Sequence, residues 1–213
     1  MLSHLTAGLV PDRDLAQPLL TYLDGPARVE LSGSTTANWI CKTANLLTDL
    51  CGGPARVGLL LPLHWQTPCL LLGAVAAGAT VVVAGAAEDL AGCDVAFTTA
   101  GTAEAALDAG VDEVFACSMT PFATRLATLP SGVSDAAVEI PGYGDHFGGR
   151  PKEARLEVGG TPVDVPVLDV TASDRVLVTD LLTALGALRA GAAVVLSSSG
   201  EASAQEGVTR SFA

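Results

Sequence analysis

The chain has 213 residues, of which 49% are hydrophobic and only 4% aromatic, and its formal net charge is −12. This length suffices for one well-buried core or for two small lobes, and the scarcity of aromatic residues leaves Ala, Val and Leu to build the core. The strong negative charge opposes binding to nucleic acids and to anionic membrane surfaces, so we expect neither as a partner.

The start of the chain and its cysteine usage indicate a cytoplasmic protein. The first residues, MLSHLTAGLVPDRDL, lack the basic segment and long apolar run of a signal peptide. The five cysteines are an odd number, form no CxxC pair or Cys/His cluster, and mostly lie in apolar periodic segments. That pattern is typical of reduced, buried thiols, so we expect no metal site.

The first half of the chain alternates strand and helix patterns. A short strand, ARVEL at 27–31, precedes the turn SGSTT and a helix over about 35–50. Apolar positions in this helix recur at spacings of three and four, which predicts one buried face. These positions are Ala37, Ile40, Ala44, Leu47 and Cys51.

The stretch from 57 to 87, VGLLLPLHWQTPCLLLGAVAAGATVVVAGAA, contains no Asp, Glu, Lys or Arg and is long enough for a membrane span. Its two prolines enclose the polar group HWQT, no basic cluster flanks it, and Gly78 precedes a β-branched run. We therefore favour a soluble interpretation with strand 57–61, a buried helix over about 65–77 and strand 80–84. This order is typical of a parallel sheet covered on both faces.

The remaining elements follow the same alternation. One strand–helix–strand unit is predicted at Val95–Thr99, 102–109 and Glu113–Cys117, and a last unit at 175–179, 180–190 and 192–197. Between them, 130–172 lacks strong periodicity, so we expect a loop-rich connector with a small hairpin at Arg155–Val158 and Val163–Val167. The tail, 198–213, is expected to form one terminal helix.

These elements divide the chain into three parts. We predict an N-terminal α/β lobe at 1–129, the connector at 130–172, and a C-terminal βαβ unit at 173–213 that packs on the first lobe.

Two stretches resemble the N-terminal part of the adenylate-forming superfamily, the AMP-binding proteins that include acyl-CoA synthetases, the adenylation domains of peptide synthetases and the luciferases. They are VELSGSTTANWICKTANLL and ARVGLLLPLHWQTPCLLLGAVAAGATVVV. Members typically show a helix with an ANxLA-like pattern, a strand ending in LP, and a buried helix ending in AGA before a valine-rich strand. The matching residues are Ala44–Leu47, Leu61-Pro62, Ala77–Ala79 and Val81–Val83.

A third stretch, SDRVLVTDLLTALGALRAGAAVVLS at 173–197, looks like the unit that follows the ATP-binding loop in those enzymes. The details ANW, KTANLL and HWQT are most similar to a small bacterial family of short, stand-alone AMP-binding-like proteins of unassigned activity. The resemblance covers roughly 18–118 and 173–210. It implies an α/β fold with a parallel, doubly wound sheet like the N-terminal subdomain of adenylate-forming enzymes, with a truncated second βαβ unit.

The phosphate-binding loop of that superfamily has no counterpart in the sequence. Its pattern, SGTTGxPKG, supplies backbone amides and hydroxyls that hold the phosphates of ATP. The corresponding place would be 146–172, which does not contain it. The resemblance also implies adenine contacts, a magnesium-binding Glu and a mobile lid with a Lys, and no residue of this sequence can be assigned to them. We therefore expect no bound cofactor.

Two segments contain some letters of such a loop. The first is Ser32–Thr36, SGSTT. We interpret it as a strand-to-helix turn in which Ser34 or Thr35 caps the helix, and not as a phosphate site, because no Pro-Lys-Gly follows. In Ser197–Glu201, SSSGE, we favour a polar connection, because Glu201 would repel a phosphate.

The candidate binding residues lie in two loops. His64, Trp65 and Gln66 follow a predicted parallel strand at its carboxyl end, where open α/β sheets bind ligands. The superfamily arrangement would bring a Gly-rich loop to the same edge, with three further candidates: Tyr143, Asp145 and His146. The alternatives are a helix cap with a packed Trp65 and a solvated Asp/His pair. No catalytic residue is assigned, since no GxSxG motif or nucleophile with a base is present.

Two functions remain open. In the first, the protein is a catalytically degenerate, AMP-binding-like relative of acyl-CoA synthetases that binds a small ligand or a partner protein without chemistry. In the second, it is an adenylate-forming, acyl-CoA ligase-type fragment that activates a carboxylate with ATP. The missing loop favours the first. The ligand, the partner and the oligomeric state are left open by the sequence.

Overall fold

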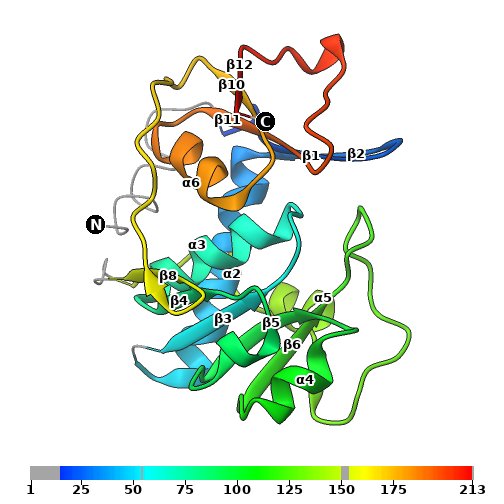
Figure 1. The fold of residues 1–213 in the computed structure, drawn as a ribbon, viewed down its shortest axis with the longest axis vertical. Coiled ribbons are helices and arrows are strands. Elements are labelled where there is room, and N and C mark those ends of the chain that lie inside the picture. The colour runs from blue at the N-terminus through cyan, green and yellow to red at the C-terminus, as the bar shows by residue number, and fades with distance from the viewer. Residues whose placement is uncertain (1–14, 54, 150–153, 213) are drawn as a thin grey trace.

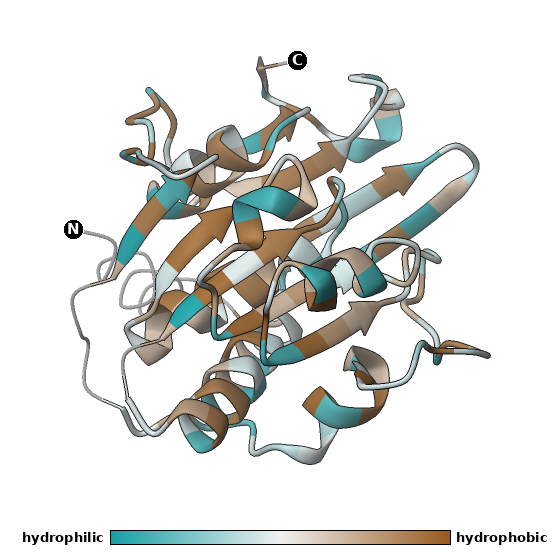
Figure 2. Ribbon diagram, turned by 60° about the horizontal axis from the view of Figure 1, so that its bottom comes forward, coloured by the Kyte–Doolittle hydropathy of each residue, from teal (hydrophilic) through white to brown (hydrophobic). Residues whose placement is uncertain are grey.

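The computed structural model describes residues 15–53, 55–149 and 154–212. Two β-sheets lie one above the other in Figure 1, with helices between them and further helices on the far side of the larger sheet. In Figure 2 the strands are mostly brown and therefore hydrophobic, while teal, hydrophilic residues concentrate in the loops and on exposed helix surfaces.

The larger sheet has seven strands in the order β7-β6-β5-β3-β4-β8-β9. Every neighbouring pair is parallel except β8 and β9, which form a short antiparallel hairpin. The strands are β3 (Arg56–Leu60), β4 (Thr80–Val83), β5 (Val95–Thr99), β6 (Glu113–Cys117), β7 (Val133–Asp135), β8 (Arg155–Val158) and β9 (Thr161–Pro162).

The smaller sheet has five strands in the order β12-β10-β11-β1-β2. They are β1 (Pro18–Asp24), β2 (Ala27–Ser32), β10 (Arg175–Val178), β11 (Ala193–Ser197) and β12 (Arg210–Phe212). The β1–β2 pair is an antiparallel hairpin, and the other pairs are parallel. Leu20 of β1 lies opposite Val194 of β11, so the sheet joins the start of the described chain to its end.

Three helices fill the space between the sheets: α2 (Gly33–Cys51), α3 (Gln66–Ala77) and α6 (Leu181–Arg189) (Figure 1). Eleven of the twelve residues of α3 are buried, because this helix has protein on every side. Its side chains share one hydrophobic core with residues of both sheets, such as Leu20 and Val57. The other helical segments are η1 (Ala87–Leu90), α4 (Ala103–Asp108), α5 (Ala136–Glu139), η2 (Ile140–Gly142) and η3 (Ala204–Glu206).

The close approach of α2 and α3 depends on Gly73. A Cβ atom at this position would come 2.5 Å from Cβ of Thr43 and 3.0 Å from the carbonyl oxygen of Ile40. Any side chain at 73 would therefore force the two central helices apart.

The predicted fold class is confirmed: the fold is α/β with mostly parallel strands, although the strands are divided between two sheets rather than one. The uncharged stretch 57–87 forms β3, α3, β4 and the start of η1, close to the predicted boundaries. The last turn of α3 ends at Gly78, whose φ is 84°. In 15–53, 55–149 and 154–212, no helix combines the length and the apolar character that crossing a bilayer requires.

Two predictions about local structure are wrong. The tail does not form one terminal helix but a short 3-10 turn, η3, followed by strand β12. Gly200 and Gly207 adopt φ of 72° and 60°, in the left-handed region that interrupts a helix. The second strand of the predicted hairpin lies at Thr161–Pro162 rather than at 163–167. The division into lobe, connector and C-terminal unit stays a prediction.

Candidate functional site

The two faces of the five-stranded sheet differ in polarity. Along β2, Val29 and Leu31 belong to the hydrophobic core, whereas Arg28 and Glu30 point to the other face. On β1, Thr21 lies opposite Glu30 and shares that outer face. The outer face of the β1–β2 hairpin is therefore polar, while its inner face packs on the central helices.

A groove with a volume of about 670 Å³ lies at the carboxyl ends of β1 and β11, on this outer face. Leu23 lies opposite Ser197 on one neighbouring strand and opposite Arg28 on the other, and all three residues line the groove. The turn of the β1–β2 hairpin and the segment 197–206 complete its walls. We call this cavity the carboxyl-end groove.

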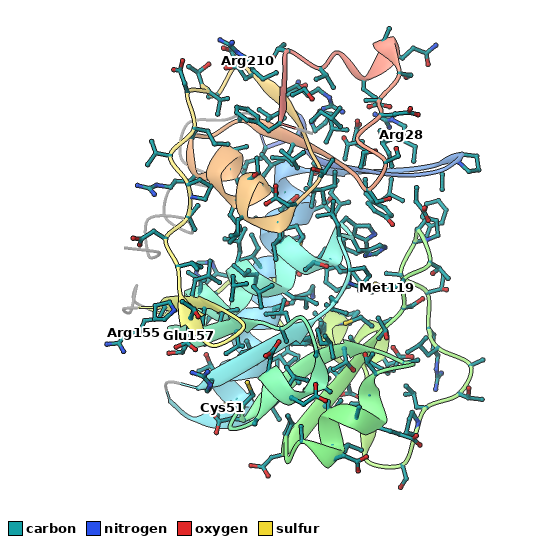
Figure 3. The ribbon with its side chains drawn as sticks, viewed as in Figure 1. Arg28, Cys51, Met119, Arg155, Glu157 and Arg210 are labelled. Atoms are coloured by element: carbon teal, nitrogen blue, oxygen red, sulfur yellow. The ribbon has the colours of Figure 1, made fainter. Side chains whose placement is uncertain are left out.

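A buried glutamate attaches the segment 197–206 to the sheet. Only 6% of the Glu206 side chain is exposed. Its Oε1 accepts a hydrogen bond from Nε of Arg28 at 2.7 Å, and its Oε2 accepts from Nη2 of Arg28 and Nη2 of Arg175, both at 3.2 Å. Figure 3 shows Arg28 between the hairpin and the red C-terminal segment.

Glu30 and Thr21 complete this network. Arg28 also pairs with Oε2 of Glu30, and Arg175 donates to Oγ1 of Thr21 at 2.7 Å. Hydrogen bonds from Arg28 and then Arg175 lower the pKa of Glu206, and those from Glu206 and Glu30 raise the pKa of Arg28. We call Arg28, Glu30, Arg175 and Glu206 the Glu206 clamp.

The clamp separates the carboxyl-end groove from a second groove of about 390 Å³. This second groove lies at the amino ends of the strands, beside Ser173, Asp174 and Ala193. The two grooves share Arg28, Gln205 and Glu206 as lining residues. The outer face of the sheet thus carries two hollows with a wall of paired charges between them.

The serine-rich loop after β11 bonds largely to itself. Oγ of Ser197 donates to the carbonyl oxygen of Glu201 at 2.9 Å and lies 3.1 Å from Oγ of Ser199. Oγ of Ser199 also accepts from the backbone N–H of Glu201 at 3.3 Å. No described residue bonds to the hydroxyls of Ser198 and Ser203 or to the carboxylate of Glu201, all exposed, so these groups can contact a ligand.

Three of the candidates from the sequence, His64, Trp65 and Gln66, are buried at the start of α3. Nε2 of His64 lies 3.2 Å from the carbonyl oxygen of Thr120, and Nε1 of Trp65 donates to that of Pro121 at 2.9 Å. These side chains hold the loop that follows β6 against the helix.

Trp65 has the packed position that the sequence offered as the alternative to a ligand contact. The residue is only 4% exposed and packs edge-on against Trp39, with ring centroids 5.1 Å apart. The amide of Gln66 is fully buried, and no group in the described part of the chain hydrogen-bonds to its Oε1 or Nε2.

The other three candidates, Tyr143, Asp145 and His146, lie against α2. The hydroxyl of Tyr143 donates to Oδ2 of Asp49 at 3.2 Å, and Oδ1 of Asp145 lies 2.8 Å from Nζ of Lys42. Backbone carbonyls in this loop, including that of His146, accept from Lys42 and from Asn45.

The structure does not join the two groups of candidates by any hydrogen bond, ion pair or ring contact among the described residues. Within the same ranges, no three His, Cys, Asp or Glu side chains gather as a metal site would require. A binding role for the six candidates stays a prediction.

The SGSTT segment caps a helix, as the sequence favoured, but through a different residue. Oγ of Ser32 accepts from the backbone N–H of Thr35 at 3.1 Å, so α2 begins at Gly33 and Ser32 is its N-cap. The predicted caps, Ser34 and Thr35, lie inside the helix. The carboxyl-end groove was not predicted from the sequence, although the alternation of Arg28 and Glu30 with Val29 and Leu31 is typical of a strand with one polar and one apolar face.

No protein-family model matches the chain. The chain is 36% identical over 180 residues to a protein of Mycobacterium tuberculosis named as a TIGR03089 family protein. The alignment covers 78% of this chain and 73% of that protein. The chain belongs to the TIGR03089 family. Its relative is bacterial, as the sequence resemblance implied.

Solved structures show the same fold at lower sequence identity. An acyl-CoA synthetase of Brucella canis matches with a TM-score of 0.71 and 14% identity, over 90% of this chain and 42% of that chain. The N-terminal domain of FACL13 from Mycobacterium tuberculosis matches with a TM-score of 0.62 and 16% identity, over 92% and 56%. An ATP-bound RpMatB-BxBclM chimera matches with a TM-score of 0.66 and 13% identity, over 92% and 45%.

These likenesses establish an AMP-binding-like, acyl-CoA synthetase-like fold for this TIGR03089 family member. The chain spans less than two thirds of each of these solved chains. The predicted resemblance to the N-terminal part of the adenylate-forming superfamily is confirmed at the level of the fold.

Proposed function

We propose that this protein binds a small ligand in the carboxyl-end groove and forms no acyl-adenylate. The observation that carries the proposal is the groove itself. Its volume of about 670 Å³ is in the range of small-molecule sites. It lies at the carboxyl ends of parallel strands, where ligands of open α/β sheets bind.

The charges around the groove support binding without adenylation. Adenylate formation needs groups that hold a triphosphate, place a metal and align a carboxylate. Arg28, the cation that lines the groove, is already paired with Glu206 and Glu30. The two serine-rich segments that share letters with a phosphate loop make caps and internal hydrogen bonds instead.

A second candidate function is carboxylate activation by an acyl-CoA synthetase-like ligase. It is favoured by the fold shared with an acyl-CoA synthetase and with an ATP-bound chimera. The same experiment distinguishes the two functions.

The test uses the full chain in two measurements. Ligand binding is followed by backbone amide chemical shifts against a panel of ATP, AMP, carboxylates, sugars and amines, and pyrophosphate release is measured with ATP, magnesium and the carboxylates. We expect a panel member to shift amides of 23–28 and 197–206, with no pyrophosphate formed. Pyrophosphate release above the rate without protein would establish the second function.

A matched pair of variants locates the binding site. Ser198→Leu adds bulk to the wall of the groove, whereas Ser131→Leu makes the same change at another exposed serine outside it. Ser198→Leu should weaken binding by about tenfold or more, while Ser131→Leu should leave it unchanged. If both variants bind as the unchanged protein does, the ligand lies elsewhere and the groove is not its site.

A further inference from the structure

We infer that the carboxyl-end groove selects polyhydroxylated ligands without negative charge, namely sugars and amino sugars. This inference rests on the proposed function and specifies the ligand class of the same site. It is carried by the Glu206 clamp, which balances the charge of the only cation lining the groove in the described part of the chain, and by the neutral groups along its walls.

The charges of the groove oppose an anion. Its charged lining residues are Arg28, Glu201 and Glu206, one positive and two negative. Arg28 would be the natural partner of a phosphate or a carboxylate. Its Nε and Nη2, however, both donate to the carboxylate of Glu206, and Nη2 also pairs with Glu30.

Moving Arg28 to an anionic ligand would uncover a buried charge. The Glu206 side chain is 6% exposed, and losing the bidentate pair would leave it with Arg175 alone. Removing one partner of a buried ion pair costs more free energy than a new exposed ion pair contributes. We therefore expect Arg28 to remain paired with Glu206 when a ligand is bound, so that the ligand contacts mainly the other lining residues of the groove.

Those remaining groups suit hydroxyls. Ser198, Ser203 and Gln205 present neutral donors and acceptors, and Glu201 presents an exposed carboxylate that can accept from a hydroxyl or an ammonium group. Apolar surface lines the same groove and can pack on the C–H face of a sugar ring: Leu23, Pro26, Ala27 and Ala202. A lining that combines polar groups with apolar surface suits a sugar, which has hydroxyl edges and a C–H face.

The test compares matched probes that differ in charge. For glucose, galactose and mannose, binding of the free sugar, of the 2-amino sugar and of the 6-phosphate to the full chain is measured by amide chemical shifts and by calorimetry. We expect at least one free or amino sugar to shift amides of 23–28 and 197–206. Its 6-phosphate should bind about tenfold more weakly or worse.

A variant separates the role of Glu201 from general surface charge. Glu201→Gln should weaken the binding of an amino sugar about three- to tenfold and change the affinity for the free sugar by less than about twofold. Glu104→Gln, an exposed carboxylate on α4 outside the groove, is the matched control and should change neither.

The outcomes distinguish this inference from the proposed function. If AMP, a sugar phosphate or a carboxylate binds and Ser198→Leu weakens that binding, the groove is a site but its selectivity for uncharged ligands is wrong. If neither the sugars nor ATP, AMP, carboxylates and amines shift the groove amides, both the inference and the proposed function fail.

Discussion

His64 and Thr120 are joined by a hydrogen bond that fixes the state of the histidine ring. Nε2 of His64 lies 3.2 Å from the carbonyl oxygen of Thr120, while Nδ1 accepts from the backbone N–H of Gln66 at 3.3 Å. One donor and one acceptor match the neutral imidazole. Burial lowers the pKa of His64 to about 4, and the hydrogen bond to Thr120 opposes this only in part.

Protonation of His64 should therefore couple to unfolding. In the unfolded chain the His64 ring takes up a proton near its ordinary pKa of about 6.5. In the folded protein the ring stays neutral until the pH falls to its lowered pKa of about 4. Since the unfolded state binds more protons in this interval, stability should fall as pH drops from about 6.5 to 4, by up to roughly 3 kcal/mol. Chemical denaturation at several pH values measures it.

His64→Gln should flatten that pH dependence, and His146→Gln, which changes an exposed histidine, should preserve it. An equal slope in both variants would show that His64 is not the group responsible.

Glu206→Gln should destabilise the protein by about 1–3 kcal/mol, because it leaves Arg28 and Arg175 without their shared carboxylate. The folded pKa of Glu206 is lowered, so the stability it contributes is present above its ordinary pKa and lost as pH falls through the folded value. The variant should thus lose part of the acid sensitivity below about pH 4.5. Glu201→Gln, an exposed change in the same segment, should show neither effect.

Gly73→Ala should destabilise the protein by about 1–3 kcal/mol, since the added methyl group would overlap Thr43 where the two central helices cross. Gly142→Ala is the control, because nothing lies within 4 Å of a Cβ at that position. Urea denaturation of both variants gives the comparison. Equal midpoints would mean that α2 and α3 separate without cost.

Gly78→Val should cost about 1–2 kcal/mol or more, because a β-branched side chain resists the φ of 84° that ends α3. Gly78→Asn should cost less, since Asn adopts the left-handed region more readily. The unfolding midpoints in urea rank the variants. If Asn were no better than Val, strain at this φ would not explain the loss.

Asp145→Ala and His146→Ala should each change stability by less than about 1 kcal/mol, because both side chains are exposed and the Asp145–Lys42 pair is a surface ion pair. The two variants therefore test the predicted binding role of this loop without unfolding the protein. Weaker binding of any panel ligand would support that role. Unchanged binding in both variants would exclude Asp145 and His146 from the site.

The central strands and helices were predictable because the pattern of residues within each segment is enough to indicate its secondary structure. The uncharged run before Gly78 permits few alternatives to a buried helix, and its observed bounds differ from the predicted ones by one residue. Strand β1, PLLTYLD, was not predicted, since its strongest support comes from pairing with β11 near the other end of the chain. The tail was wrongly predicted as a helix. Its conformation depends on a long-range ion pair between Glu206 and Arg28 of the hairpin, which the sequence pattern around Glu206 does not predict.

The candidate site was harder to predict for the same reason. Polar residues after a parallel strand are expected at a ligand edge, yet His64 and Trp65 use their polar atoms to hold a loop. The groove arises where β1, β2 and the segment after β11 meet. Its polar lining comes from Arg28 of β2 and from the segment 197–206, and neither forms a recognisable binding motif alone.

The pairing of β1 with β11 also constrains the order in which the protein can fold during synthesis. The β1–β2 hairpin is synthesised well before its parallel partner β11, which lies far downstream in the sequence. Until β11 is synthesised, the N–H and C=O groups along one edge of β1 have no strand to pair with. Leu20 and Tyr22 also lack part of their packing in the core. The seven-stranded sheet can form its central strands before then, so completion of the smaller sheet should be a late step, and incomplete chains should be the species most prone to associate through that edge.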